Sequence, residues 1–390
     1  MTVLGCQKGI RINHRQRCFV SGCLQRPRVE RGRGRIDALQ RNDLLPGSIS
    51  VSRLCLGTML FGESTTACSA ATLLNQAAES GVNFFDTAEM YPVPQRAATQ
   101  GRSEAILGSW LRSRCREDFV IATKVTGPSG QMTWIRNGPS ALDSASITAA
   151  IDGSLQRLGT DYIDLYQLHW PDRYVPMFGE TRYHPENAYT AVPLEQQLEA
   201  LAAAQQAGKI RHIGLSNETA WGLMECCRLS KARQDLPRIA SLQNAYSLLC
   251  RTFEGALAEC CHLEQVPLLA YSPLAMGLLT GKYLGGGPEG ARLNKYKGRY
   301  AEAESRYGMK PNTLAALQAY TALAHSATMS PAELAIRFAM SNTLVANVIV
   351  GATSSEQLQE ILEAADKGPL TRDLLDAIDD IHQRYPNPNP

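Results

Sequence analysis

Four side chains of different chemical type stand at or just beyond the ends of three apolar segments of this 390-residue chain. Asp86 and Tyr91 follow the first segment, Lys124 lies near the end of the second, and His169 closes the third. A carbonyl that accepts a hydride becomes an oxyanion and needs a proton, but a phenol with a pKa near ~10 donates poorly at neutral pH. A neighbouring ammonium would ease ionisation of the phenol, a carboxylate would hold that ammonium, and an imidazole would orient the carbonyl. The four residues therefore indicate carbonyl reduction without a metal ion.

Each of these residues also has an ordinary structural explanation. Tyr91 would fit as a half-buried aromatic, Lys124 as a long chain that keeps its charge in solvent, and His169 as a core histidine. The combination favours a catalytic role, because the four residue types that carbonyl reduction requires occupy suitable positions and no metal-binding cluster offers an alternative site. The eleven cysteines contain no C-x-x-C pair, and the seven histidines, which do not stand at ligand spacing, are His14, His169, His184, His212, His262, His325 and His382.

Eight short apolar runs rich in β-branched and aromatic residues carry these side chains. Segments between them, such as Ser144–Leu158, repeat apolar residues at the helical i, i+3, i+4 spacing. This alternation predicts an α/β fold, a closed (β/α)8 TIM barrel whose strands end on one common face. The predicted strands are Val51–Gly57, Val82–Thr87, Phe119–Val125, Tyr162–His169, Ile210–Asn217, Ile239–Tyr246, Pro267–Leu274 and Asn347–Thr353.

An open, doubly wound sheet is the alternative arrangement. It normally carries a G-x-G-x-x-G motif after its first strand, and no such motif follows Val51–Gly57. The glycine spacing in Gly277–Lys282 does not match a phosphate-binding loop, and Tyr283 stands where that loop has Ser or Thr. We therefore favour the barrel, with long loops at the carboxyl face formed by residues 126–142, 171–193 and 281–310.

Composition places the chain among ordinary globular proteins, with 44% hydrophobic and 19% charged residues. Lys and Arg number 39 against 37 Asp and Glu, so nucleic-acid binding has no compositional support. No uncharged apolar stretch reaches the ~18 residues of a transmembrane helix. We expect one barrel domain over residues 37–390, with no nucleic-acid partner and no membrane span. These patterns do not determine the oligomeric state.

Residues 1–36 differ from the rest of the chain by their basic character. The first 29 of them contain no acidic residue, and they carry Lys8, Arg11, Arg15, Arg17, Arg26 and Arg28. Such a segment is typical of a transit peptide, which predicts a plastid or mitochondrial location. The alternatives are a disordered basic leader, or sequence added by an upstream start codon, in a cytoplasmic protein.

The motifs around the four residues resemble those of the aldo-keto reductase superfamily. Asp86-x4-Tyr91, Lys124 in Ile121–Lys124 and His169 in Leu165–Trp170 are similar to the catalytic tetrad of that family. The resemblance extends over about residues 50–385. Its further motifs are Gly214–Glu218, Leu242–Ser247, Ala270–Leu274 and Val350–Ser354, and Asp86–Pro94 and Gly101–Glu104 are most similar to the Tas-type NADP(H)-dependent reductases of bacteria and plant plastids.

This resemblance implies a role for each member of the tetrad. Tyr91 would be the proton donor, Lys124 and Asp86 the pair that tunes it, and His169 the residue that orients the carbonyl. It also implies NADP(H) as cofactor and a small carbonyl compound as substrate. The residues that would bind the cofactor are Gly57, Thr58, Met59, Ser216, Asn217, Gln243, Tyr271, Ser272, Pro273, Leu274, Gly277, Lys282, Arg292, Gly351, Thr353, Gln357 and Glu360.

Within that set, amide and hydroxyl groups would hold the nicotinamide carboxamide while Tyr271 closes one face of the ring. Lys282 and Arg292 would meet phosphates; the alternative is that they form a solvated face in a basic loop. A helix starting near Ser355 offers N–H groups to a 2′-phosphate. Ile361 departs from the family pattern, which carries Asn there to bind adenine.

The same resemblance leaves two other functions open. Potassium-channel β subunits share this fold and retain cofactor with slow turnover, so a redox-sensing or regulatory subunit is the alternative to an enzyme. A scaffold without catalysis is disfavoured by the complete tetrad.

Overall fold

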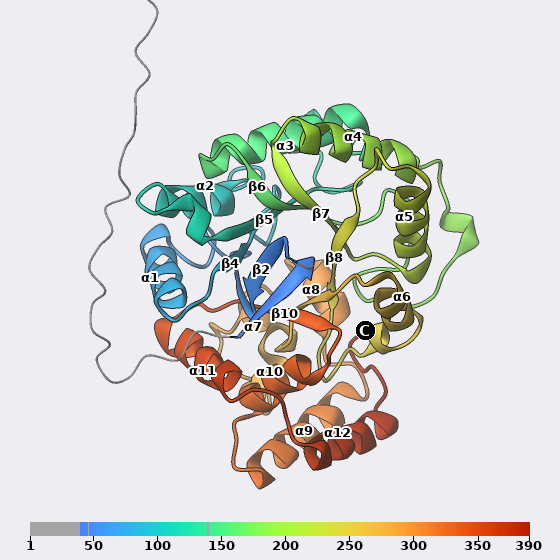
Figure 1. The fold of residues 1–390 in the computed structure, drawn as a ribbon. Helices are drawn as coiled ribbons and strands as arrows, with labels where there is room; N and C mark the ends of the chain where they lie inside the picture. Colours follow the sequence, from blue (N-terminus) through green and yellow to red (C-terminus); the bar gives the residue numbers. More distant parts are fainter. Residues whose placement is uncertain (1–39, 46, 139) are drawn as a thin grey trace, which may run out of the picture. The chain divides into compact units, whose positions relative to one another are not determined.

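Eight parallel strands close into a barrel at the centre of the structure, a computed structural model that describes residues 40–390 except 46 and 139 (Figure 1). The barrel order is β10-β3-β4-β5-β6-β7-β8-β9. Seven of the predicted runs contain one of these strands, and the eighth, Asn347–Thr353, overlaps β10 but begins two residues late and ends three residues beyond it, so the (β/α)8 fold is confirmed. The strands are β3 (Leu54–Gly57), β4 (Phe84–Asp86), β5 (Val120–Val125), β6 (Ile163–Leu168), β7 (Ile210–Ser216), β8 (Ile239–Ala245), β9 (Leu268–Tyr271) and β10 (Val345–Val350).

Helices surround the barrel and begin at residues suited to cap them. Asp143 accepts a hydrogen bond of 2.7 Å from the Ser146 N–H at the start of α3, and Gly159, at φ 65°, ends that helix. The outer ring contains α1 (Ala67–Glu79), α2 (Arg102–Leu111), α3 (Ser144–Leu158), α4 (Leu194–Gln206), α5 (Ala220–Ala232), α6 (Ala256–Glu264), α10 (Pro331–Ser341) and α11 (Ser355–Asp366).

Further helices lie in the connections and at the edge of the ring. In Figure 1, α9 (Thr313–Ser326) and α12 (Arg372–Arg384) lie side by side outside the barrel, and the two pack against each other. The connection after β9 contains α7 (Arg292–Lys295) and α8 (Ala301–Tyr307). No helix in the described ranges is both long and apolar enough to cross a membrane. The predicted leader, residues 1–36, lies outside the described residues.

The strands are buried on both faces, which explains their continuous apolar sequence. All six residues of β6 and all six of β10 are buried. One side of the barrel wall packs against the helices, while a smaller cluster containing Cys55, Phe84 and Leu165 fills the interior. This packed interior is a core rather than a channel.

An antiparallel hairpin before the barrel was missed by the sequence analysis. It consists of β1 (Arg41–Leu45) and β2 (Ile49–Ser52), and its apolar side chains join the interior cluster. The predicted strand Val51–Gly57 was therefore wrong at its start, because Val51 belongs to β2. The chain turns between β2 and β3, where the Asn83 amide accepts from the Ser52 N–H at 2.7 Å and donates to the Ser50 carbonyl at 3.0 Å.

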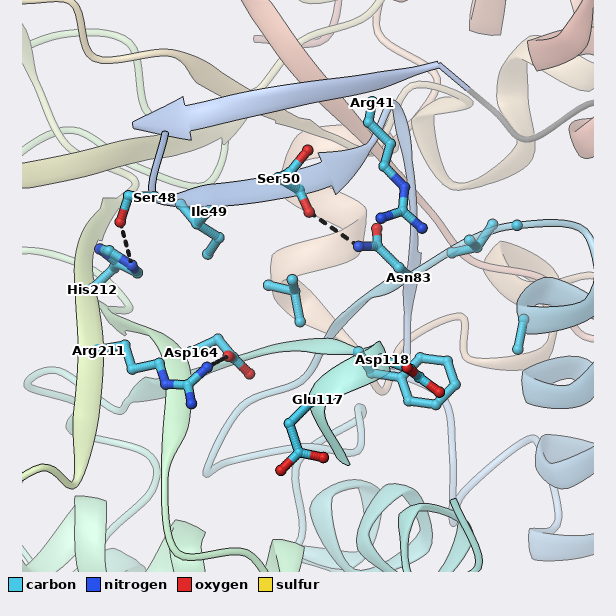
Figure 2. Close-up of a pocket in the computed structure, with 15 residues that line it drawn as sticks. Arg41, Ser48, Ile49, Ser50, Asn83, Glu117, Asp118, Asp164, Arg211 and His212 are labelled. Carbon is cyan, nitrogen blue, oxygen red and sulfur yellow. Dashed lines mark hydrogen bonds and ion pairs between the residues drawn. The ribbon is translucent and has the colours of Figure 1, made fainter. Parts of the chain in front are cut away.

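A pocket of about 550 Å³ lies beside this hairpin at the amino ends of the strands (Figure 2). Its polar side chains contact one another. The Arg211 guanidinium donates to Asp164 at 3.1 Å, and Ser48 Oγ lies 3.2 Å from His212 Nε2. Burial lowers the pKa of His212. Because the amino face of such barrels serves stability and the carboxyl face serves function, the functional site is expected at the opposite end of the barrel.

Candidate active site

A layer of buried polar side chains crosses the barrel interior near its carboxyl end. Asp86 ends β4, Lys124 lies on β5, Gln167 on β6 and Gln243 on β8. Lys124 and Gln167 are direct partners in the β5–β6 register, and Gln167 pairs with Gly214 on β7. A Cβ atom at Gly214 would lie 3.1 Å from Gln167 Cγ, so glycine leaves room for this amide.

Asp86 is the centre of this layer. Its Oδ2 accepts a 2.5 Å hydrogen bond from Lys124 Nζ, and its Oδ1 accepts from Gln167 at 3.1 Å and Gln243 at 2.9 Å. Lys124 Nζ also donates to the Thr87 carbonyl at 2.8 Å. Lys124 is 0% exposed and Asp86 3% exposed. The ammonium is therefore held in the interior by an ion pair whose carboxylate is bonded on both oxygens.

Tyr91 and His169 complete the predicted tetrad above this pair. The ring centroid of Tyr91 lies 5.1 Å from Lys124 Nζ and 5.6 Å from the His169 ring centroid, with an interplanar angle of 82° to the imidazole. Both rings are buried. The structure thus brings together all four residues that the sequence analysis singled out, from positions spread over more than eighty residues.

The surroundings of His169 disfavour the charged form of its imidazole. Burial, and secondarily the positive charge of Lys124, hold the pKa of His169 well below its ordinary value. The backbone carbonyl of this residue accepts a 2.8 Å hydrogen bond from the Asn217 amide, which fixes the chain beside the ring. A neutral imidazole offers one N–H donor, which is what a carbonyl oxygen requires.

The three long loops at the carboxyl face build an apolar wall around Tyr91. Met132 and Ile135 come from the first loop, Phe178 from the second, and Tyr296 from the third. Trp170, next to His169, joins the same cluster and lies 6.2 Å from Phe178 between ring centroids. The side chains above the phenol are therefore suited to an apolar or aromatic ligand.

Residues predicted to hold the nicotinamide lie next to His169. The Tyr271 hydroxyl donates to Asn217 Oδ1 at 2.5 Å, and the Asn217 Nδ2 group lies 3.3 Å from Ser216 Oγ. Asn217 has φ 53°, a left-handed conformation that Asn tolerates better than most residues. The Gln243 amide N–H₂ donates one hydrogen bond to Asp86 Oδ1 and another, of 3.1 Å, to Gln167 Oε1. It therefore supports the tetrad directly, a role that the sequence analysis missed.

Two basic residues lie together in the loop after β9. Burial, and secondarily the charge of Arg292, lower the pKa of Lys282. Arg292 Nε and Nη2 are buried and have no hydrogen-bond partner among the described residues. Gly277, at φ 94°, passes so close that a Cβ atom there would lie 2.7 Å from Lys282 Cε. Buried guanidinium donors beside a second cation suit a phosphate group, which is the fit expected for a dinucleotide.

The turn that leads from β9 into this loop contains Ser272, Pro273 and Leu274. Ser272 has φ 56°, and its carbonyl accepts from the Ala275 N–H at 2.9 Å, while the Leu274 carbonyl accepts from Gly277 at 2.8 Å. The successive residues Ala275, Met276 and Gly277 all have positive φ. The N–H groups of Ala275 and Gly277 are thus used within the turn, which gives the chain a tight, defined path from β9 into the loop.

The residues predicted for the adenosine end surround the start of α11. Gln357 Oε1 accepts from both the N–H and the hydroxyl of Thr353, each at 3.0 Å, and Glu360 accepts from Ser330 Oγ at 2.8 Å. Gly351 and these residues are exposed. Ile361 is 3% exposed and packs in the core, so burial accounts for its aliphatic side chain.

The first predicted cofactor segment lies beside Asp86. The Thr58 N–H and hydroxyl both donate to the Asp86 carbonyl, at 2.9 and 3.1 Å, and Ser103 Oγ donates to the Thr58 carbonyl at 2.7 Å. Gly57 packs against Ile349, and Met59 contacts the cluster around Tyr91. This arrangement favours a supporting role for Thr58.

Three further residues of the site escaped the sequence analysis. Gln167 stands two residues before His169, so strand alternation places both on one face, which was a usable signal. Glu89 and Arg136 form a buried ion pair, but 47 residues separate them and their approach depends on loop conformation. Of this pair, only Glu89, the acidic residue inside Asp86–Tyr91, could have been singled out in advance.

Comparison with known proteins agrees with this geometry. A family model described as the aldo/keto reductase family matches residues 53–383. The chain is 44% identical over 354 residues to the protein tas of Escherichia coli K12, covering 90% of this chain and 100% of that protein. It is 30% identical over 358 residues to a rice protein named probable voltage-gated potassium channel subunit beta, covering 89% and 98%.

A third relative is the L-glyceraldehyde 3-phosphate reductase of Escherichia coli K12, 28% identical over 316 residues, with 78% of this chain and 81% of that protein covered. The matched region contains the whole barrel together with Asp86, Tyr91, Lys124 and His169. The chain therefore belongs to the aldo/keto reductase family, a family of oxidoreductases.

Proposed function

We propose that the protein is an NADP(H)-dependent oxidoreductase that reduces aldehydes or ketones to alcohols. The observation that carries this proposal is the fully buried Lys124, bonded to Asp86 and 5.1 Å from the ring centroid of Tyr91. A buried ammonium beside a phenol stabilises the phenolate, and so makes the phenol a better acid. The family membership makes such an acid useful, since the product of hydride addition to a carbonyl needs a proton.

In the proposed reaction, His169 donates a hydrogen bond to the carbonyl oxygen and orients it toward Tyr91. NADPH, when bound, supplies the hydride to the carbonyl carbon. Tyr91 transfers its phenolic proton to the oxygen as negative charge develops there, and Lys124 stabilises the phenolate that remains. Asp86 holds Lys124 in place throughout, since its carboxylate is itself restrained by two glutamine amides.

The residues that would hold the cofactor fit a phosphorylated dinucleotide. Asn217 and Ser216 would bind the carboxamide, and Tyr271 would cover one face of the ring. Arg292 would bind phosphate oxygens with the Nε and Nη2 donors that protein groups in the described part of the chain leave unused, and Lys282 would add a second positive charge. The pyrophosphate is common to NADP(H) and NAD(H), so the proposed preference for NADP(H) requires one of these cations to reach the 2′-phosphate, which NAD(H) lacks.

The proposal is tested by NADPH oxidation at 340 nm with 4-nitrobenzaldehyde as a reactive carbonyl. Wild-type protein should show turnover, and Tyr91→Phe should lose about 10²-fold or more of kcat. The same variant should still quench and shift NADPH fluorescence on binding, since the phenylalanine keeps the packing of the ring. Undiminished turnover in Tyr91→Phe would remove the proton-donor role.

A regulatory subunit is the second candidate, favoured by the similarity to the rice protein whose name includes a potassium channel subunit beta. The two functions differ in turnover rather than in cofactor binding. Wild-type protein that binds NADPH tightly and yet oxidises it negligibly with a panel of aldehydes would favour the regulatory subunit.

A further inference from the structure

We propose that the buried ion pair between Glu89 and Arg136 positions one wall of the substrate pocket and thereby selects which carbonyl compounds are reduced. This inference rests on the proposed function, because selection among substrates presupposes turnover. Three loops contribute to the apolar surroundings of Tyr91; the wall meant from here on is the first of them, the loop of residues 126–138 that follows β5.

The carboxylate of Glu89 joins both ends of this loop. Arg136 Nη1 donates to both carboxylate oxygens, and Arg136 Nη2 donates to the Thr126 carbonyl at 3.0 Å. The Thr126 N–H in turn donates to Glu89 Oε2 at 2.9 Å. Glu89 is 2% exposed. One buried side chain thus closes a loop of ten peptide units on itself.

The backbone of the loop adopts conformations that side chains ordinarily avoid. Arg136 has φ 51° and Asn137 φ 62°, and the next residue, Gly138, would place a Cβ atom 2.4 Å from the Thr133 carbonyl oxygen. A left-handed arginine is unfavourable without compensation from its surroundings. We infer that the contacts of the guanidinium provide that compensation and determine the path of the loop.

The loop carries side chains that contact the phenol cluster. Met132 and Ile135 are buried in the cluster that contains Tyr91, and Trp134 packs against it. The indole Nε1 of Trp134 is buried and has no hydrogen-bond partner within the described part of the chain. A substrate that places an aromatic group with a hydrogen-bond acceptor against this wall would use both the apolar surface and the indole N–H.

Tyr91 itself is held by other contacts. Its N–H donates to the Ala88 carbonyl at 3.1 Å, its carbonyl accepts from Gly101 at 2.9 Å, and Val93 donates to Met59 at 3.1 Å. None of these bonds includes Glu89 or Arg136 side-chain atoms. Loss of the ion pair should therefore displace the wall and leave the proton donor in place.

The opposite end of β5 provides a matched control. Asp164 Oδ2 accepts from the Ile121 N–H at 3.0 Å and from Arg116 at 2.6 Å, much as Glu89 accepts from Thr126 and Arg136. Asp164 is also buried, but it lies beside the amino-end pocket of Figure 2. Arg116→Met therefore disrupts an ion pair far from the substrate, at a carboxylate that keeps Arg211 as a second cationic partner.

The experiment compares two aldehydes with NADPH as cosubstrate. 4-Nitrobenzaldehyde is large enough to contact the wall and carries acceptor oxygens, whereas propanal is too small to reach it. Arg136→Met should raise KM for 4-nitrobenzaldehyde by about tenfold, with kcat and the KM for propanal changed less than about twofold. Because Arg136→Met leaves a buried carboxylate, the double variant Glu89→Gln with Arg136→Met, which buries no unpaired charge, should show the same selective increase.

A second readout does not depend on turnover. Hydrogen exchange at residues 126–138 should quicken in both variants, while exchange in β5 stays slow. Arg116→Met should change neither KM. An equal loss for both aldehydes, unchanged kinetics in both variants, or the same selectivity change in Arg116→Met would overturn the inference. Absence of turnover in wild-type protein would instead refute the proposed function, and this inference with it.

Discussion

Replacing Lys124 by methionine should separate the chemistry of the site from its stability. The Lys124 side chain is 0% exposed and that of Asp86 4% exposed, so the variant leaves a carboxylate in the interior without its cation. Removing one partner of a buried pair typically costs about 3–5 kcal/mol of unfolding free energy. For a protein of this size, the loss corresponds to a decrease in Tm on the order of 10 °C. Turnover should fall by about 10²–10⁴-fold, because the phenol loses the charge that makes it acidic.

The double variant Lys124→Met with Asp86→Asn makes this prediction specific. The asparagine keeps an acceptor for the Gln167 and Gln243 amides but carries no charge, so about 2 kcal/mol or more of the lost stability should return. Turnover should not return. Urea unfolding followed by circular dichroism gives the stability, and NADPH oxidation gives the rate. A single variant as stable as wild type, or a double variant that regains activity, would refute the reasoning.

Three other properties follow from the structure. The pKa of His169 is depressed in the folded state, so unfolded chains bind the extra proton first as pH falls below about 6.5. The contribution of His169 to the free energy of unfolding should therefore be fully present above that pH and decline below it. His169→Gln should make the stability measured by urea unfolding less pH-dependent between about pH 5 and 6.5. An unchanged pH dependence would argue against a neutral buried imidazole. Arg292→Gln should weaken NADPH binding by about tenfold, measured by fluorescence titration, with a smaller effect on NADH; equal effects on the two would place Arg292 away from the 2′-phosphate. We also propose that residues 1–36 direct import into an organelle, so their fusion to a fluorescent protein should relocate it to plastids or mitochondria, whereas a diffuse cytoplasmic signal would favour the plain leader.

The barrel was predictable because its strands are buried on both faces and mostly apolar. Every residue of β6 and β10 is buried, so polar residues such as Asp164, Gln167 and Asn347 are few within them, and each predicted run is bounded by a helical repeat. The β1–β2 hairpin was not predictable in this way. Its strands are short, and Arg41, Asn42 and Asp43 interrupt their apolar pattern.

The tetrad was predictable because strand ends of a parallel barrel meet on one face, whatever the loops do. The residues that hold Asp86 were harder to foresee. Gln167 lies against Gly214 on the next strand, where a Cβ atom would approach its Cγ to 3.1 Å, and Gln243 reaches Asp86 from β8, which is not a neighbour of β4 in the barrel. The pairing of Glu89 with Arg136 depends on two left-handed residues in a loop, and this backbone conformation cannot be predicted from the residue types.

The strand that carries Lys124 is secured at both of its ends. A carboxylate accepts the N–H of Ile121 near the start of β5, and another accepts the N–H of Thr126 just beyond its end. Such two-point attachment resists sliding of the strand along its own axis, so the height of the Lys124 amine in the barrel is fixed from both ends of β5. Substitutions of loop residues that contact neither of these carboxylates should therefore leave the position of Lys124 unchanged.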